Sequence, residues 1–75
     1  MPYIAIKCYP KDEETKKTAV EKINEVMLEV WGCPPEALTI SIEEVPREEW
    51  VKTVKEPEID QKLDKMYIVS GEKKY

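Results

Sequence analysis

The sequence predicts an α/β (α+β) fold in which two strands and one long helix form a βαβ unit. Residues 2–9 and 38–45 alternate apolar and polar side chains with the period of two that is typical of strands. Between them, residues 13–31 carry apolar side chains at spacings of three and four, which indicates an amphipathic helix. A helical crossover of this length joins parallel strands, and such connections are right-handed. We therefore expect a parallel strand pair with the helix packed on one face.

Proline, glycine and capping residues predict where these elements end. Pro10 ends the first strand, because proline cannot donate to a strand ladder. Asp12 is an N-cap for the helix, and Gly32 followed by two prolines stops it. The apolar stripe expected to face the sheet comprises Ala19, Val20, Ile23, Val26, Met27, Val30 and Trp31. The charged residues outside this stripe are expected to be solvated, namely Lys16, Lys17, Glu21, Lys22 and Glu25.

The last third of the chain predicts short elements. Proline followed by acidic residues predicts a helical turn that begins within residues 45–50. Apolar spacing predicts a short helix over about residues 58–66, and residues 67–69 form a small strand. Residues 71–75 are expected to be a mobile tail. The whole chain, residues 1–75, is expected to be a single domain.

This predicted fold is incomplete in a single copy. A two-stranded sheet under one helix is not stable in water, and a chain of 75 residues buries only a modest core. The second face of the sheet and both of its edges are left open. We therefore expect a homodimer that extends the sheet. The residues on the open face are Tyr3, Ala5, Thr39 and Ser41.

Composition excludes several classes of function. A formal net charge of −4 argues against a nucleic-acid partner and means that an anionic substrate needs a local cation. The chain has no histidine, and its two cysteines, Cys8 and Cys33, lack metal-site spacing, so we expect no metal. The same absence excludes a Ser-His-Asp site, and the two glycines form no phosphate-binding loop.

Hydropathy and cysteine usage bear on location. No apolar run is long enough to span a membrane, and the start of the chain lacks a basic and hydrophobic leader. We therefore expect no membrane partner and a cytoplasmic location. In that reducing compartment Cys8 and Cys33 are expected to be free thiols.

Pro2 is the most informative single residue. A small second residue normally allows removal of the initiator methionine, which leaves a secondary amine at the N-terminus. An ordinary α-amine has a pKa of about 7.7–8.0, and desolvation on an apolar strand lowers it toward neutrality. Without histidine, this amine is the chain's candidate for proton transfer near pH 7. Taken by itself, however, Pro2 is also an ordinary proline at the start of a strand.

Two segments resemble the 4-oxalocrotonate tautomerase family, and in particular its short, dimeric bacterial members. The first is Pro2-Tyr3-Ile4-Ala5-Ile6-Lys7-Cys8-Tyr9-Pro10, and the second is Leu38-Thr39-Ile40-Ser41-Ile42-Glu43-Glu44-Val45-Pro46-Arg47-Glu48-Glu49-Trp50. The resemblance covers about residues 2–60 and implies the βαβ tautomerase fold. Residues 50–54, which contain no glycine, replace the Gly-rich hairpin of the hexameric members, and this favours a dimer.

The resemblance also implies an activity and a set of site residues. It implies a cofactor-independent tautomerase in which Pro2 is the general base for small 2-oxo or 2-hydroxy-dienoate carboxylates, or aryl pyruvates. Lys11 lies at or beside the family's arginine after the first strand, and Thr39 stands where a second family arginine is found. Arg47 replaces that missing cation, or else pairs with nearby glutamates. Trp50 matches an aromatic wall of the pocket, or else anchors the core or an interface.

Two further alternatives stay open at this point. Lys11 is either the carboxylate-binding cation or an ordinary loop lysine. The chain is the tautomerase described, or a non-catalytic small oligomeric binding module on the same fold, or an enzyme with Schiff-base or hydratase chemistry at Pro2, since a secondary amine is also a nucleophile. If Met1 is retained, the Pro2 nitrogen is an amide and cannot act as a base.

Overall fold

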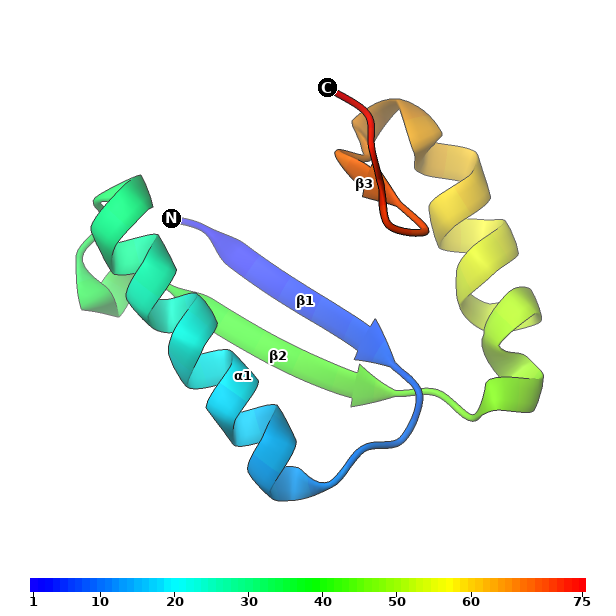
Figure 1. Cartoon of the computed structure of the whole chain (residues 1–75), viewed down its shortest axis with the longest axis horizontal. Helices are drawn as coiled ribbons and strands as arrows, with labels where there is room; N and C mark the ends of the chain where they lie inside the picture. Colours follow the sequence, from blue (N-terminus) through cyan, green and yellow to red (C-terminus); the bar gives the residue numbers. More distant parts are fainter. The chain divides into compact units, whose positions relative to one another are not determined.

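The computed structural model describes residues 1–75, and the chain divides into two compact units. The first unit, Met1–Val45, contains β1 (Tyr3–Cys8), α1 (Glu13–Val26) and β2 (Thr39–Glu44). The second unit, Pro46–Tyr75, contains a series of helical turns and a small hairpin. Figure 1 shows both units in order along the chain.

The first unit is the βαβ arrangement that the sequence predicts. β1 pairs with β2 in parallel, with Tyr3 opposite Thr39 at the start and Cys8 opposite Glu44 at the end. Figure 1 shows α1 beside this strand pair. Parallel pairing follows from the long crossover, since a short turn joins only antiparallel strands.

The helix occupies the predicted residues but changes geometry near its end. Asp12 is the N-cap, and its carboxylate accepts hydrogen bonds from the Thr15 N–H at 2.9 Å and the Thr15 hydroxyl at 2.8 Å. After Val26 the helix continues as a π-helix, η1 (Met27–Trp31). Gly32 ends it with a φ of 76°, and its N–H donates to the Met27 carbonyl at 3.2 Å. This left-handed conformation favours glycine, so Gly32 is the stop that the sequence predicts.

The helix stripe is less covered than expected. No residue of α1 or η1 is fully buried, and Val30 and Trp31 are 77% and 68% exposed. The expectation that the entire stripe packs on the sheet is therefore wrong. Two strands lie only about 4.8 Å apart, whereas a helix with its side chains is about 10 Å wide, so the pair is too narrow to cover it. Tyr3, on the other face, is 68% exposed.

The second unit is more helical than the sequence predicts. It begins with the expected turn, η3 (Arg47–Glu49), and continues through a π-helix, η4 (Val51–Ile59), into a 3-10 helix, η5 (Asp60–Lys65). The predicted helix at 58–66 is thus the end of a longer helical series. Pro57 lies inside η4 and has no N–H to donate, so regular α-helical bonding cannot run through it.

The chain ends in a hairpin where we expected only one strand and a mobile tail. β3 (Ile68–Val69) confirms the predicted strand, and β4 (Glu72–Lys73) pairs with it antiparallel. Ser70 and Gly71, with φ of 49° and 83°, form the two-residue turn. Positive φ at both central positions matches the twist of hairpin strands. The expectation of an unstructured segment at 71–75 therefore needs correction for residues 72–73.

Two expectations from composition are also addressed by the structure. Cys8 and Cys33 are free thiols, as predicted, and both are half-buried. None of the helices combines the length and the apolar character needed to cross a membrane.

Candidate active site

Pro2 lies at the start of the strand pair. It immediately precedes β1, is half-buried, and accepts a hydrogen bond at its carbonyl from the Thr39 N–H at 3.3 Å. Ile4 and Ile40, which are paired across the two strands, are also half-buried. Apolar neighbours of this kind disfavour the charged form of an amine by desolvation. The peptide nitrogen of Pro2 is joined to Met1, which is fully exposed.

The segments that adjoin Pro2 contribute no lysine or arginine. No lysine or arginine occurs before Lys7, and none occurs between Lys22 and Arg47. The segment that leads into β2 instead contributes Glu36. A carboxylate substrate held at Pro2 therefore finds no basic side chain supplied by the adjoining segments.

Lys11 lies beyond the other end of the same strands. Six strand residues, Tyr3–Cys8, separate the two positions, and a strand of that length spans about 17 Å at its usual rise. Figure 1 shows the start of β1 and the loop that leads into α1 at opposite ends of the strand pair. Within one chain, the structure does not bring Lys11 to Pro2.

A small polar network fixes the loop that carries Lys11. The Lys11 backbone N–H donates to Glu44 Oε2 at 2.9 Å, and Lys16 Nζ lies 3.0 Å from the same oxygen. Lys16 Nζ is also 3.5 Å from Glu13 Oε1. The expectation that Lys16 is fully solvated is wrong: its side chain is only 19% exposed, because it reaches across to Glu44 at the end of β2.

Hydrogen bonds in and beside this loop shift the pKa values of three groups. The hydrogen bond from the Lys11 backbone, reinforced by Lys16, lowers the pKa of Glu44 below its ordinary value of 4.5. The hydrogen bond to Glu44 raises the pKa of Lys16 above 10.5. Hydrogen bonds from Thr15, first from its backbone N–H, lower the pKa of Asp12 below 3.8. Each shift favours the charged form that its partners stabilise.

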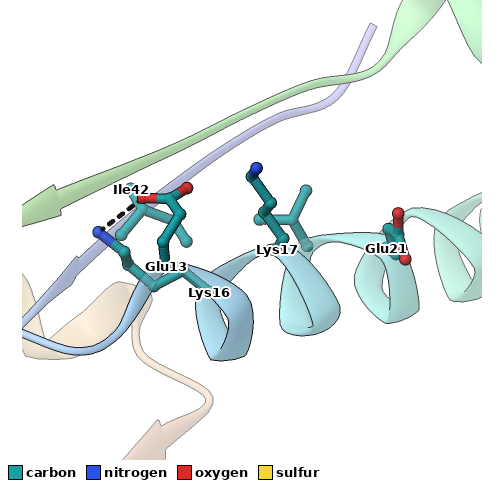
Figure 2. Close-up of a pocket in the computed structure, with 6 residues that line it drawn as sticks. Glu13, Lys16, Lys17, Glu21 and Ile42 are labelled. Carbon is teal, nitrogen blue, oxygen red and sulfur yellow. Dashed lines mark ion pairs between the residues drawn. The ribbon is translucent and has the colours of Figure 1, made fainter.

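An open groove of about 440 Å³ lies between α1 and β2. Figure 2 shows the Lys16–Glu13 ion pair at one end of this groove and Lys17 and Glu21 farther along the helix. Pro2 does not line it. The groove is lined by Glu13, Lys16, Lys17, Val20, Glu21 and Ile42.

Arg47 and Trp50 belong to the second unit. Arg47 begins η3, and its carbonyl accepts the Trp50 N–H at the end of that turn. Trp50 is half-buried and Arg47 is exposed. One turn of helix therefore holds both residues close together in the chain, directly after β2 and Val45.

The fold of the first unit is that of a small βαβ protein in which Pro2 directly precedes the first strand. The family described as "Tautomerase enzyme" matches residues 2–57, so the match starts at Pro2 and runs through Trp50. The chain belongs to the tautomerase family and is an isomerase.

Two curated relatives agree with this assignment. The chain is 31% identical over 73 residues to Tautomerase PptA of Enterobacter sp. (strain 638), covering 95% of this chain and 96% of that protein. It is 32% identical over 66 residues to Tautomerase PptA of Pectobacterium atrosepticum, covering 85% of this chain and 87% of the relative. The sequence-based identification of a short bacterial tautomerase is thus confirmed.

Proposed function

We propose that the chain catalyses keto–enol tautomerisation with the free secondary amine of Pro2 as general base, after removal of Met1. The observation that carries this proposal is the match to the tautomerase family, which begins at Pro2 itself. Full exposure of Met1 supports access by an aminopeptidase. The reaction moves only protons, so we expect it to need no cofactor.

One residue, Pro2, both accepts and returns the proton in this reaction. The neutral Pro2 amine accepts a proton from the enol or dienol oxygen, or from an α-carbon, and the resulting ammonium returns a proton to carbon. The product is the tautomeric 2-oxo acid. An amine with a pKa near ambient pH serves both steps, because it is neutral when free and acidic once protonated. Half-burial of Pro2 beside Ile4 and Ile40 favours the neutral amine.

A second copy of the chain supplies the cation in this proposal. Lys11 lies at the far end of the strand pair from Pro2, and the segments adjoining Pro2 contribute no lysine or arginine. When two copies pair antiparallel about a twofold axis, the start of one strand lies beside the end of its counterpart. Lys11 of one copy would then serve Pro2 of the other, which makes the expected homodimer part of the site.

The substrates are small anionic carboxylates of the 2-hydroxy-dienoate, 2-oxo acid or aryl pyruvate type. Their carboxylate pairs with Lys11, with Arg47 as the second candidate cation. Trp50 is proposed to pack against the dienyl or aryl part of the substrate, as aromatic side chains commonly do.

The test compares wild type with Pro2→Ala, each verified by intact mass to lack Met1. The assays follow ketonisation of phenylenolpyruvate and of 2-hydroxymuconate. The alanine variant retains a primary amine of different basicity and geometry, so we expect kcat/KM to fall on the order of 10²-fold. Protein that retains Met1 is the control, because its proline is an amide, and it should be inactive. Equal kinetics of wild type and Pro2→Ala would contradict the assignment of the base.

A further inference from the structure

One glutamate joins three parts of the first unit. Glu44 is the last residue of β2 and is paired with Cys8, the last residue of β1. Its Oε2 atom accepts the Lys11 backbone N–H at 2.9 Å and lies 3.0 Å from Lys16 Nζ. A single carboxylate oxygen therefore connects the strand end, the β1–α1 loop and the first turns of α1.

The loop between Cys8 and α1 is held on both sides of Lys11. Before it, the Val45 N–H donates to the Cys8 carbonyl at 2.8 Å and closes the strand pair. After it, Asp12 caps α1 through Thr15. Between these points, the Lys11 N–H donates to Glu44 and ties the loop backbone to the end of β2. Lys11 is an exposed residue, so its side chain is accessible to a ligand while its backbone is held by Glu44.

Lys16 holds the Glu44 carboxylate in place. Its side chain is the least exposed among the lysines in ion pairs, at 19%, against 28% for Lys7, 44% for Lys74 and 54% for Lys55. Charge-assisted hydrogen bonds of this length are stronger than neutral ones, and partial shielding reduces their competition with water. Two donors on one oxygen leave the carboxylate little freedom to rotate away from the loop.

We propose that Glu44, held by Lys16, is a positioning residue that fixes the direction in which the Lys11 side chain leaves the β1–α1 loop toward the substrate carboxylate. The proposal rests on the proposed function, in which Lys11 binds that carboxylate. Glu44 touches no substrate. It acts by fixing the Lys11 backbone, and so it limits the orientational freedom that the Lys11 ammonium loses when it binds.

Glu43 provides a matched control for Glu44. It is the preceding residue of β2, its side chain is 65% exposed, and it lies 4.0 Å from Lys7 rather than near the loop. Glu43→Ala and Glu44→Ala change the net charge equally, so any general effect on anion attraction is common to both variants. Glu44→Gln keeps an oxygen that can accept the Lys11 N–H and is the conservative variant.

The experiment measures kcat and KM for phenylenolpyruvate in wild type and each variant, alone and combined with Lys11→Ala. We expect Glu44→Ala to raise KM about threefold with kcat nearly unchanged, because binding is lost equally in the ground and transition states. Glu44→Gln should recover most of this loss, and Glu43→Ala should not raise KM. Combined with Lys11→Ala, Glu44→Ala should raise KM no further, since coupled residues are not additive.

Amide hydrogen exchange separates positioning from simple stability. The Lys11 N–H should exchange faster in Glu44→Ala than in Glu43→Ala. An equal KM increase with and without Lys11, or loss of thermal stability with an unchanged KM, would overturn the proposal, as would a silent Lys11→Ala. If Pro2 is not the base, a separate measurement shows it: Pro2→Ala then has the same kcat/KM as wild type. The KM comparison with and without Lys11 does not depend on which group is the base.

Discussion

At the residue scale, the roles of the two candidate cations can be separated by substitution. We expect Lys11→Ala to raise KM about tenfold with little change in kcat, because the interaction is made equally in ground and transition states. Arg47→Ala should have a smaller effect, since glutamates precede and follow it in the chain and an exposed ion pair contributes little. Steady-state kinetics at two salt concentrations checks this, because added salt should weaken both effects.

The control for these variants is Lys17→Ala, which removes an exposed lysine of α1 and changes the net charge by the same amount. It should leave KM within a factor of about two. If Arg47→Ala is damaging and Lys11→Ala is silent, the two roles are reversed. If neither variant differs from Lys17→Ala, backbone amides hold the carboxylate and the resemblance to the family fails at this point.

At the scale of elements, two carboxylates that fasten the ends of α1 and β2 predict acid sensitivity. The pKa values of Glu44 and Asp12 are lowered in the fold by hydrogen bonds from Lys11 and Thr15. A lowered pKa means that the stabilising contribution is complete above the unfolded values, 4.5 for Glu44 and 3.8 for Asp12, and is lost as pH falls through the folded values. Melting temperature should therefore fall as pH decreases from about 5 to 3.

Glu44→Gln tests this acid dependence. The variant should have a lower melting temperature than wild type at pH 7 and a flatter dependence on pH below 5, because one of the titrating groups is gone. Differential scanning calorimetry across this range gives the comparison. Parallel pH profiles for wild type and Glu44→Gln would show that the Glu44 contacts do not stabilise the fold.

The sequence predicts elements that depend on local backbone preferences better than it predicts contacts between distant residues. The βαβ order, Gly32 as helix stop and Asp12 as N-cap depend on local periodicity and backbone preferences, and all are present. The hairpin at the end was missed, although Ser70-Gly71 is a turn dipeptide that signals it. The Lys16–Glu44 contact joins residues 28 apart in sequence, and only the folded register brings them together.

The same contrast between local features and long-range placement holds for the candidate site. Pro2 and its apolar strand neighbours could be identified from alternation alone. Lys11 lies at the opposite end of the strand pair from Pro2, because β1 runs without interruption between them. The sequence assigned both residues to one site on the basis of the family resemblance, which does not say whether they come from the same copy. Exposure of Val30 and Trp31 could not be predicted from the helical stripe, because it depends on the width of the sheet beneath it.

At the scale of the whole molecule, a single copy buries very little. Val45 and Val54 are the buried hydrophobic residues, while Tyr3, Val30 and Trp31 are largely exposed. Such surfaces are typical of chains that associate. We therefore expect a homodimer in light scattering at micromolar concentration, with a melting temperature that rises with protein concentration. A well-folded monomer under these conditions would contradict the expectation.

A dimer in which Lys11 of one copy serves Pro2 of the other makes a stronger prediction about mixtures. Pro2→Ala and Lys11→Ala are each impaired alone, and we propose to refold them together in equal amounts. Half of the resulting dimers would be mixed, and each mixed dimer would contain one site with an intact proline and an intact lysine. At low substrate the mixture should recover about a quarter of wild-type kcat/KM, well above the average of the separate variants. If both groups instead came from the same copy, no mixed dimer would hold an intact site, and activity would stay at that average. The measurement thus decides whether the distance between Pro2 and Lys11 along β1 is bridged by a second chain.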